Sequence, residues 1–369
     1  MHTSVNSKKL LLISSEFPPQ PGGIGNHAYN VATYLQATHI AVTVLTDRRS
    51  KDGLDEVAFD DKQPFLVKRV VRRPFIFISY FNRIRMAFSL LRRNDVVLLS
   101  GKFSLWIGGM LSLFSSKKMI AVLHGSEVVL TNRLLRSYTN WCLHRFESTI
   151  AVSNYTKSLI PANLQKNCTV IPNGFAIVSE VVSEKEKTTP IHLITVGNVT
   201  ERKGQQNIIK ALPLLLQRFP ELTYHIVGIP TEKERLIALA KSLNVLEAVV
   251  FHGMVTEADK IMLLQKSSIF VMLSEATSGG DVEGFGIAIL EANALGVPAI
   301  GAKGCGIEDA IDDQFSGVLI DGNKPEELAQ GMEEVLNSYS SYSKNAISWS
   351  KKFKWDEIIR EYLKIIKMN

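Results

Sequence analysis

The feature that most constrains this chain is the alternation of short β-rich runs with helical stretches. Such alternation is typical of parallel α/β sheets, in which a helix connects each strand to the next. In the first half the predicted strands are Lys9–Ser15, Ala41–Thr46, Val96–Ser100, Met119–His124, Ser148–Val152 and Thr169–Ile171, with helices over, for example, Asn26–Gln36 and Asn132–Arg145. After a polar stretch over 179–190, predicted to be a linker, the strands are Ile191–Gly197, Leu222–Gly228, Val249–His252, Ser268–Leu273, Pro298–Gly301 and Gly317–Ile320.

The length of 369 residues fits two domains of roughly 150–200 residues each. The sequence predicts one α/β domain over 1–175 and a second over 176–351. Residues 352–369 have a helix-compatible apolar pattern, and we expect this tail to pack back on the first domain. Parallel sheets bind ligands beyond the carboxyl ends of their strands, so a cleft between the two domains is the expected binding site.

Composition excludes several classes of protein. With 46% apolar residues and only 3 cysteines, the chain is neither disordered nor stapled by disulfides. The cysteines are widely spaced and form no zinc or redox motif, which indicates a reducing compartment. The amino terminus lacks the apolar core of a signal peptide, and the longest apolar run, 103–114, falls short of the roughly 20 residues that span a bilayer. We therefore expect a cytoplasmic protein.

Charge is divided unevenly along the chain. Residues 1–175 carry 22 Lys and Arg against 10 Asp and Glu, whereas residues 176–369 carry 20 against 26. This asymmetry indicates that the first half faces an anionic partner. Nucleic acid, an acidic membrane surface and phosphorylated substrates are all compatible with the charge alone, but neither half contains a recognisable nucleic-acid-binding module.

The first glycine-rich motif is Pro21-Gly22-Gly23-Ile24-Gly25, which follows the first predicted strand and opens a helix. Glycines allow a ligand to approach the backbone closely, and a helix start offers unpaired amides. A tight turn explains the same residues. The spacing from Gly23 to Ala28, with Asp47 after the second strand, also resembles a dinucleotide fingerprint. The proline-rich segment 16–21 separates strand from glycines, however, and this argues against nicotinamide binding.

A second motif runs from Gly197 to Gly204 (GNVTERKG), directly after the first strand of the second half. Arg202 and Lys203 lie near a predicted helix start, where cations oppose the helix dipole unless an anion compensates. The motif therefore suggests a diphosphate site, although a solvated loop would look similar. No P-loop sequence occurs in the chain.

The third motif, 279–291 (GGDVEGFGIAILE), carries the strongest signal. It places Glu283 in a glycine-rich loop before a helix predicted from about Gly286 to Leu295. The amides of Phe285, Gly286 and Ile287 could receive a phosphate. Glu291 interrupts an otherwise apolar helix and needs polar partners, either sugar hydroxyls or other groups of the core.

A fourth motif, Leu123-His124-Gly125-Ser126-Glu127, ends a strand of the first half. A histidine at this position points toward the expected cleft, although a lone histidine is more often structural. Taken in order, EFPPQPGGIGNH, HGSE, AVSNYTKSLI, VIPNGF, GNVTERKG and the Glu-x7-Glu element resemble the retaining glycosyltransferases of family 4. The resemblance covers almost the whole chain and implies the GT-B fold, with two Rossmann-like α/β domains facing a central cleft.

The resemblance also implies roles for individual residues. His124 matches the cleft histidine near the reacting sugar, and Glu283 matches the glutamate that faces the donor sugar; these are the candidate catalytic residues. The residues implied to bind the nucleotide-sugar donor are Gly23, Arg202, Lys203, Val255, Lys260, Phe285, Gly286, Ile287 and Glu291. Within this set Glu291 holds the ribose, Lys203 holds the diphosphate, and Val255 and Lys260 frame the nucleobase.

One position departs from the family pattern. Many members have an arginine where Asn198 stands, and Arg202 is the residue that could replace its charge. No Asp-x-Asp triplet occurs, and GT-B enzymes typically use protein cations in place of a metal, so we expect no metal or other cofactor. The resemblance implies that the acceptor attacks the same face of the sugar from which the phosphate leaves. The leaving phosphate then accepts the proton of the acceptor.

Residues 68–93 are strongly basic and contain eight Lys and Arg. Within them Phe77, Phe81, Ile84, Phe88 and Leu91 form a stripe at helical spacing, flanked by Arg83, Arg85, Arg92 and Arg93. The simpler interpretation is an amphipathic helix with its stripe in the core. The alternative is a surface that docks on anionic membrane, with exposed aromatic residues near 75–81.

The sequence therefore predicts a retaining, metal-independent hexosyltransferase that uses a UDP- or GDP-sugar. Its expected acceptor is a lipid-linked or other membrane-proximal glycan in surface polysaccharide synthesis, such as lipopolysaccharide, made at the cytoplasmic face of the inner membrane. Two alternatives remain: a GT-B-fold nucleotide-sugar epimerase, and a non-catalytic protein that binds a nucleotide-sugar. The donor sugar, the nucleobase, the acceptor and the oligomeric state are not predicted.

Overall fold

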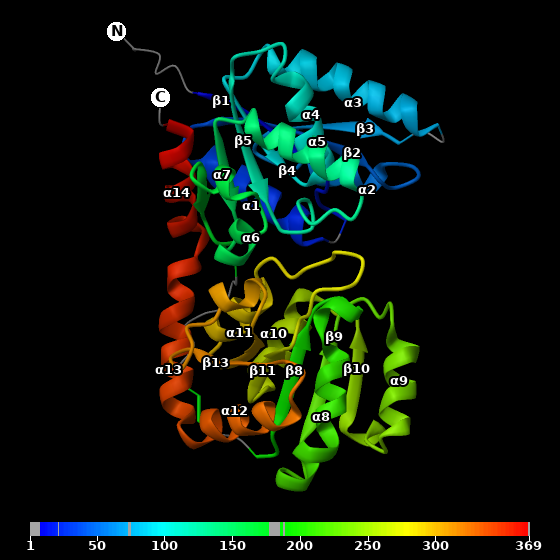
Figure 1. The fold of residues 1–369 in the computed structure, drawn as a ribbon, viewed down its shortest axis with the longest axis vertical. Helices are drawn as coiled ribbons and strands as arrows, with labels where there is room; N and C mark the ends of the chain where they lie inside the picture. The colour runs from blue at the N-terminus through cyan, green and yellow to red at the C-terminus, as the bar shows by residue number, and fades with distance from the viewer. Residues whose placement is uncertain (1–7, 21, 73–74, 177–184, 187–188, 368–369) are drawn as a thin grey trace. The chain divides into compact units, whose positions relative to one another are not determined.

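The computed structural model describes residues 8–20, 22–72, 75–176, 185–186 and 189–367 (Figure 1). The chain divides into two compact units. Unit 1 comprises Met1–Pro172 and Trp355–Asn369, and unit 2 comprises Asn173–Lys354. The domain boundaries therefore lie within a few residues of the expected positions 175 and 351. Most of the predicted linker 179–190 lies outside the described residues.

Unit 1 contains a seven-stranded parallel sheet with the order β3-β2-β1-β4-β5-β6-β7. Its strands are β1 Lys9–Ser14, β2 Ala41–Arg48, β3 Leu66–Val71, β4 Val96–Ser100, β5 Lys118–Leu123, β6 Ser148–Ala151 and β7 Cys168–Val170. Its helices are α1 Gly23–Ala37, α2 Leu54–Asp60, α3 Ile76–Leu91, α4 Lys102–Leu111, α5 Arg133–His144, α6 Asn154–Ser158, α7 Ala162–Gln165 and α14 Trp355–Lys367. The strands from β1 to β3 extend the sheet toward one edge and those from β4 to β7 extend it toward the other, so the strand order reverses between β1 and β4.

Unit 2 contains a six-stranded parallel sheet with the order β10-β9-β8-β11-β12-β13. Its strands are β8 His192–Val196, β9 Thr223–Val227, β10 Val249–Gly253, β11 Ile269–Met272, β12 Ala299–Ala302 and β13 Gly317–Ile320. Its α-helices are α8 Gln205–Arg218, α9 Lys233–Ser242, α10 Glu257–Lys266, α11 Ile287–Ala294, α12 Pro325–Asn337 and α13 Tyr339–Ser350. Short 3-10 turns at Glu201–Lys203, Leu246–Ala248, Gly306–Asp309 and Lys351–Phe353 complete the described elements.

Each strand predicted from the sequence has a counterpart, and the prediction of two Rossmann-like parallel α/β domains is confirmed. The sequence missed β3. This edge strand, LVKRVV, has two basic residues between two apolar pairs and overlaps the start of the basic segment 68–93, in which only a helix was predicted. Lys and Arg on an edge strand are common because they discourage pairing with other chains.

Helices cover both faces of the unit 1 sheet. Alternate residues of each strand point to opposite faces, so each strand contributes to both cores. Leu11 and Ile13 of β1 pack in one core with residues of α3, α4 and α5. On the other face, α1 contacts β1 and β2 and is itself covered by α14. The tail buries Trp355, Ile358, Ile359, Tyr362 and Ile366, and the Tyr362 hydroxyl lies 3.0 Å from Nε2 of His27 on α1. This last helix follows unit 2 in the sequence but packs on unit 1, the packing that was expected for the tail.

The aromatic stripe of α3 is not a core stripe throughout. Phe77 and Phe81 are 82% and 66% exposed, and Phe75 just before the helix is 73% exposed. Among the described residues, the apolar side chains that α3 buries are Ala87 and Leu91, in its C-terminal half. The simpler interpretation, a stripe directed into the core, is therefore wrong for the first two turns. The helical spacing of the apolar residues is as predicted, but in these two turns the apolar side chains lie on the surface.

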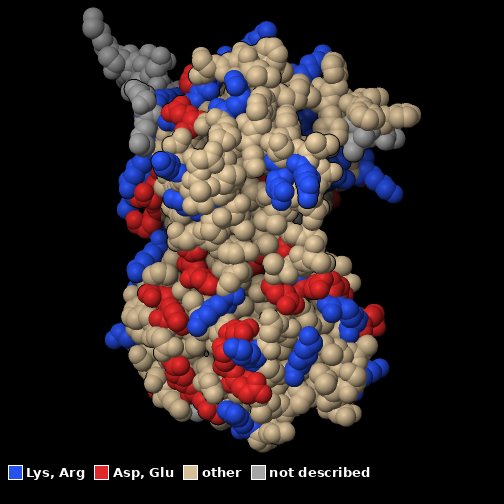
Figure 2. Space-filling view, viewed as in Figure 1, with Lys and Arg blue, Asp and Glu red and all other residues tan. Residues whose placement is uncertain are grey.

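Three further observations concern the class of protein. Among the described residues, no helix is both long and apolar enough to cross a bilayer. All three cysteines are buried free thiols. On the face drawn in Figure 2, acidic side chains gather mainly on unit 2, in agreement with the uneven charge of the two halves.

Candidate active site

The candidate site in unit 2 lies at the carboxyl edge of its sheet, where β8 and β11 are neighbours. The strand order reverses at this point, and doubly wound sheets bind ligands at such switch points. The loop after β8 supplies the motif 197–204, and the loop after β11 leads into the motif 279–291. Two segments about eighty residues apart in the sequence therefore meet at one edge.

Gly204 explains how closely these two segments approach. Its φ of +73° is unfavourable for other residues, and a Cβ on it would lie 1.7 Å from the carbonyl oxygen of Leu273, which directly follows β11. Glycine therefore allows the turn Glu201–Lys203 and the start of α8 to rest on the end of β11. This contact places Arg202 and Lys203 beside the loop that carries Glu283.

Glu283 is the centre of a charge cluster. Its carboxylate accepts a contact of 2.7 Å from Nζ of Lys203 and is also contacted by Nη1 of Arg202. The Arg202 Nε lies 3.0 Å from Oδ2 of Asp281. Burial by itself would raise the pKa of Glu283, but Lys203 and Arg202 outweigh burial and hold that pKa below its usual value. Glu283 is therefore an anion, and two cations converge on it.

The start of α11 faces the same loop. Gly286 adopts φ +93° immediately before the helix, and among the described residues the amides of Gly286 and Ile287 have no hydrogen-bond acceptor. The first amides of a helix lack intrahelical partners and attract anions. Phe285 is buried against Phe353, with the ring centroids 5.9 Å apart. Of the predicted phosphate cradle, Gly286 and Ile287 thus offer amides, and Phe285 anchors the loop.

Glu291 has a protein partner. Both of its carboxylate oxygens lie 3.0 Å from Nζ of Lys260 on α10, which also contacts Glu257 at 2.8 Å. Burial raises the pKa of Glu291 and Lys260 opposes this shift, with a net increase. Lys260 therefore supplies a polar partner for Glu291 from within the protein, which is the second of the two alternatives given for this residue above. Val255 lies in the short connection between β10 and α10, half-buried.

Several residues at this edge were missed from the sequence. Buried oxygens of Thr200, Gln205 and Ser274 have no hydrogen-bond partner among the described residues. Buried polar atoms are normally paired, so unpaired ones at a ligand-binding edge indicate where a ligand or water would bind. Ser274 follows β11 and Thr200 precedes the Arg202 turn. Position at a strand end was the only available signal for either residue.

The position where the family pattern has an arginine is exposed. Asn198 contributes its backbone carbonyl, which accepts a hydrogen bond of 3.2 Å from Nε2 of Gln205. Arg202 lies in the adjacent turn, and its charge is engaged by Asp281 and Glu283. A cation is therefore present near this point, although it comes from a different residue.

In unit 1, His124 follows β5 directly. Its Nε2 lies 3.0 Å from Oγ of Ser100 at the end of β4, and its ring packs edge-on against His27 with centroids 4.9 Å apart. Burial lowers the pKa of His124 to about 4, so the ring is neutral near pH 7. Its backbone amide donates to Oε2 of Glu127 at 3.1 Å.

Glu127, the last residue of the HGSE motif, is 2% exposed and has no cationic partner among the described residues. Burial raises its pKa to about 7, with Glu16 contributing in the same direction. Carboxyl groups with raised pKa values are frequent at functional sites. Glu127 belongs to the fourth motif, but no role was predicted for it from the sequence.

Gly23 is the first residue of α1 and is exposed, and nothing lies within 4 Å of where its Cβ would be. The protein itself therefore leaves room for a side chain at this position. Space of this kind suits a ligand that approaches the helix start, the role implied for the glycine loop. Asp47, named above as part of a possible dinucleotide fingerprint, instead forms ion pairs with Arg72 and Arg83.

In sum, unit 2 brings Arg202, Lys203, Glu283 and the start of α11 to one edge, with Lys260 and Glu291 paired nearby. Two cations and free amides form a suitable environment for a diphosphate. Among the described residues, no group of three or more His, Cys, Asp or Glu side chains is arranged to hold a metal ion.

Comparison with known proteins agrees with this geometry. Residues 21–177 match the family model described as Glycosyltransferase Family 4, and residues 179–352 match the model described as Glycosyl transferases group 1. The two matches together cover nearly all of the chain. The protein belongs to glycosyltransferase family 4.

Relatives of this glycosyltransferase differ in acceptor. The GDP-mannose-dependent α-(1-6)-phosphatidylinositol monomannoside mannosyltransferase of Mycolicibacterium smegmatis is 26% identical over 356 residues, covering 89% of each chain. Glycogen synthase of Mycobacterium tuberculosis is 26% identical over 373 residues, covering 92% of this chain and 88% of the relative. Anabaena HepE in complex with UDP and glucose has the same GT-B fold, with a TM-score of 0.77, 17% identity, and coverage of 97% and 99%.

Proposed function

We propose that this glycosyltransferase moves a hexose from a UDP- or GDP-sugar to a lipid-linked or other membrane-proximal glycan, with retention at the anomeric carbon. The observation that carries the proposal is the cluster of Lys203 and Arg202 beside the start of α11 at the switch point of unit 2. Glu291, one and a half turns into α11, is the group proposed to bind the ribose hydroxyls. This cluster offers what a nucleoside diphosphate requires.

The proposed step breaks the bond between the anomeric carbon and the diphosphate oxygen. Negative charge then grows on the diphosphate, where Lys203, Arg202 and the amides of Gly286 and Ile287 would stabilise it. The acceptor oxygen forms the new bond on the same face, and its proton passes to the leaving phosphate. We expect this step to need no metal, since protein cations supply the positive charge.

Glu283 has a specific consequence for donor binding. Because both cations contact its carboxylate in the structure, an incoming diphosphate would compete with Glu283 for them. Once displaced, the carboxylate is free to accept hydrogen bonds from the hydroxyls of the donor sugar. His124, neutral near pH 7, is proposed to position that sugar by a hydrogen bond and not to act as a base.

Two donor classes deserve a direct test. The mycolicibacterial relative uses GDP-mannose by its name, and the similar HepE structure contains UDP. Thermal-shift and calorimetric titrations with GDP-mannose, UDP-glucose and ADP-glucose would identify the base, and release of the matching diphosphate would report turnover. Transfer or hydrolysis of the sugar supports the transferase. An isomerised nucleotide-sugar would indicate the epimerase instead, and binding without turnover would indicate a binding protein.

The first prediction concerns Lys203. Lys203→Met should lower kcat/KM for the selected donor by about 100-fold, because a preorganised charge at the leaving group is lost. Lys210→Met, an exposed lysine on α8, removes the same charge away from the site and should leave turnover unchanged. Equal activity of both variants would refute the assignment. Turnover that persists after EDTA treatment, with retention seen by NMR of the product, would support the rest of the mechanism.

We also propose that unit 1 contacts an anionic membrane through α3. Phe75, Phe77 and Phe81 are 73%, 82% and 66% exposed, and Ile78 is 46% exposed. Arg85 on the same helix, and Arg92 at its end, are exposed as well. Large exposed apolar side chains that are flanked by arginines suit the boundary between anionic headgroups and acyl chains.

The second prediction tests this surface by flotation with vesicles containing phosphatidylglycerol. The double variant Phe77→Ser/Phe81→Ser should bind at least about tenfold more weakly, because two apolar side chains no longer insert. Leu54→Ser, which changes a 69% exposed leucine on α2, is the matched control and should bind like the parent protein. Binding should also weaken with salt. No binding of the parent protein at any salt concentration would refute the proposal.

A further inference from the structure

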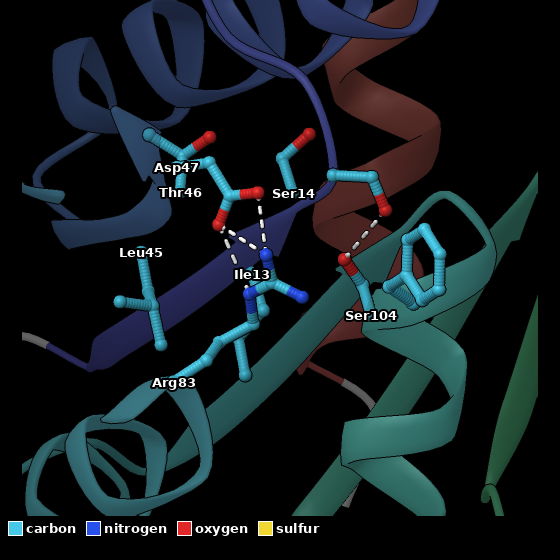
Figure 3. Close-up of a pocket in the computed structure, with 9 residues that line it drawn as sticks. Ile13, Ser14, Leu45, Thr46, Asp47, Arg83 and Ser104 are labelled. Carbon is cyan, nitrogen blue, oxygen red and sulfur yellow. Dashed lines mark hydrogen bonds and ion pairs between the residues drawn. The ribbon is translucent and has the colours of Figure 1, made fainter. Parts of the chain in front are cut away.

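Unit 1 has a small open depression, with both polar and apolar lining residues, that the donor chemistry does not use. It lies at the carboxyl ends of β1, β2 and β4, next to the point between β1 and β4 where the strand order reverses (Figure 3). It is small and open to solvent, with a cavity volume of about 10 Å³, so a ligand group would lie at its mouth. Its lining residues are Ile13, Ser14, Ser15, Leu45, Thr46, Asp47, Arg83, Phe103 and Ser104.

Two hydrogen-bond donors in the depression have no partner. The Arg83 guanidinium uses Nε, at 3.0 Å, and Nη2 to contact Asp47, which leaves its Nη1 without a hydrogen bond among the described residues. This side chain is only 13% exposed. Thr46 is 3% exposed, and its hydroxyl also has no partner. Leaving the buried Thr46 hydroxyl unpaired is costly, so a ligand or water is expected to pair with it.

The start of α4 contributes further donors. Gly101 adopts φ +85° before the helix, and a Cβ there would lie 2.7 Å from Oγ of Ser15. Glycine thus lets the helix start approach the end of β1, where the hydroxyls of Ser15 and Ser104 lie 3.3 Å apart. The amides of Lys102 and Phe103 are the first of α4, and a helix start carries partial positive charge.

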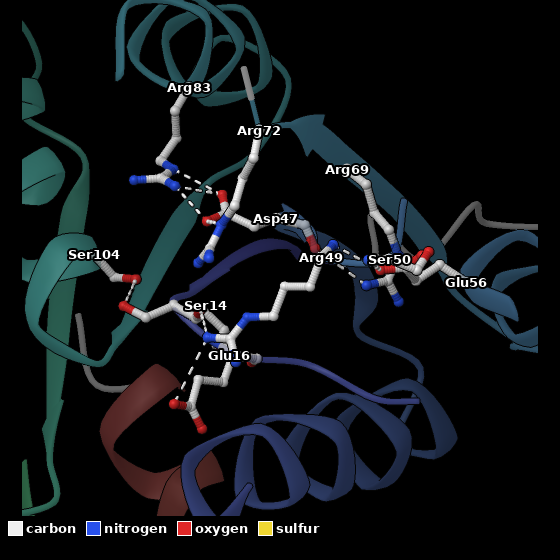
Figure 4. Close-up of polar contacts among 11 residues, drawn as sticks. Ser14, Glu16, Asp47, Arg49, Ser50, Glu56, Arg69, Arg72, Arg83 and Ser104 are labelled. Atoms are coloured by element: carbon white, nitrogen blue, oxygen red, sulfur yellow. Dashed lines mark hydrogen bonds and ion pairs between the residues drawn. The ribbon is translucent and has the colours of Figure 1, made fainter. Parts of the chain in front are cut away.

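The charge around the depression is positive. Asp47 is shared by two arginines, Arg83 and Arg72, whose Nε lies 3.1 Å from Oδ2 (Figure 4). Arg69 and Asp60 nearby form a one-to-one pair at 2.7 Å. Within the part of the chain that the structure describes, one guanidinium charge therefore remains uncompensated beside the depression. Since both Asp47 oxygens are occupied, the groups left over are mainly donors, which favours an anion over a neutral ligand.

We propose that this depression binds a phosphate group of the acceptor, held by Nη1 of Arg83, the hydroxyls of Thr46 and Ser104, and the start of α4. The inference rests on the proposed function, because it names a chemical feature of the acceptor. A phosphodiester headgroup and a free phosphate monoester share this chemistry. The positive excess of unit 1 then has a second, local role besides contact with a membrane surface.

The test uses the full-length protein with the donor site saturated by its nucleoside diphosphate, or carrying Lys203→Met. Calorimetric titrations with inorganic phosphate, glycerol 1-phosphate and glycerophosphoinositol give dissociation constants for phosphate, a monoester and a diester. Thr46→Val should raise the dissociation constant of the bound probe about three- to tenfold, and Ser104→Ala similarly. Arg83→Lys should raise it about tenfold or more, since the guanidinium fork is lost.

The controls separate binding from folding. Thr46→Val removes a buried hydroxyl without a partner, so its melting temperature should not fall. Thr33→Val, on α1 outside the depression, should leave probe binding unchanged. Donor nucleotide binding should be unaffected by Thr46→Val, so a failure of the donor screen and a failure of this inference are distinguishable.

Each outcome is decisive. Binding of the diester indicates a lipid headgroup and binding of the monoester alone indicates a terminal phosphate, and both support the site. Absence of binding by all three probes would overturn it. The same holds if Thr46→Val and Ser104→Ala leave the dissociation constants unchanged, or if neutral methyl α-mannoside competes as well as the phosphates do.

Discussion

At the scale of single residues, two buried glutamates show how neighbours decide charge. Glu283 lies between Lys203 and Arg202, which outweigh burial and lower its pKa. Glu127 is as deeply buried but has no cation beside it, and burial raises its pKa to about 7. The same side chain is therefore held ionised at one site and close to neutral at the other.

The third prediction follows from Glu127. Its native pKa of about 7 exceeds the ordinary value of 4.5, so between these pH values the unfolded chain releases the proton first. Native stability should therefore fall as pH rises from 4.5 to 7, by up to about 3 kcal/mol from this group. Glu127→Gln removes this dependence. The variant should gain in melting temperature relative to the parent protein as pH rises, and the gain should level off above pH 7.

His124 provides the opposite dependence and serves as a reference. Its pKa is depressed to about 4, so the stability it contributes is present above pH 6.5 and is lost as pH falls toward 4. The histidine is present in both proteins, so its effect cancels in their difference. Parallel pH profiles of the two melting temperatures, measured by calorimetry, would contradict the raised pKa of Glu127.

At the scale of elements, the contact between α8 and β11 decides whether the donor site forms. The turn with Arg202 and Lys203 rests on the end of β11 only because residue 204 has no side chain. The close approach is between backbone atoms, which cannot move aside as the end of a flexible side chain can. Displacing α8 would also move both cations away from Glu283.

The fourth prediction compares two glycines with left-handed backbones. Gly204→Ala should destabilise unit 2 by more than about 3 kcal/mol and abolish donor binding, because it adds a steric clash to the conformational cost. Gly253→Ala, at φ +68° with nothing within 4 Å of its Cβ, should cost only about 1–2 kcal/mol. Denaturant titration of both variants measures the difference. Equal losses would show that the clash is relieved by a small shift.

At the scale of the whole molecule, the chain enters unit 2 after Pro172 and returns to unit 1 at Trp355. Helix α14 then completes the core over α1, with Trp355 stacked against Tyr34 at a centroid distance of 6.0 Å. Unit 1 therefore depends on residues that follow the whole of unit 2 in the sequence. Unit 2, by contrast, is one continuous segment.

The fifth prediction tests this dependence. Ile366→Ala, at a residue that is fully buried in unit 1, should destabilise that unit by about 2–5 kcal/mol and speed hydrogen exchange in α1. Arg360→Ala, whose side chain is 65% exposed on the same helix, is the control and should change stability by less than about 0.5 kcal/mol. Faster exchange in unit 2 with α1 unchanged would contradict the assignment of α14 to unit 1.

The sequence by itself determined the strand–helix alternation, the two α/β domains, the tail helix and the motifs at the strand ends, because periodicity and glycine placement are local properties. Only the tertiary structure decided that Lys203 and Arg202 share Glu283, that Lys260 holds Glu291, that the aromatic residues at the start of α3 are exposed, and that Arg83 and Arg72 share Asp47. These pairings join residues 25 to 81 positions apart. Packing sets them, and no local pattern encodes which partner is reached.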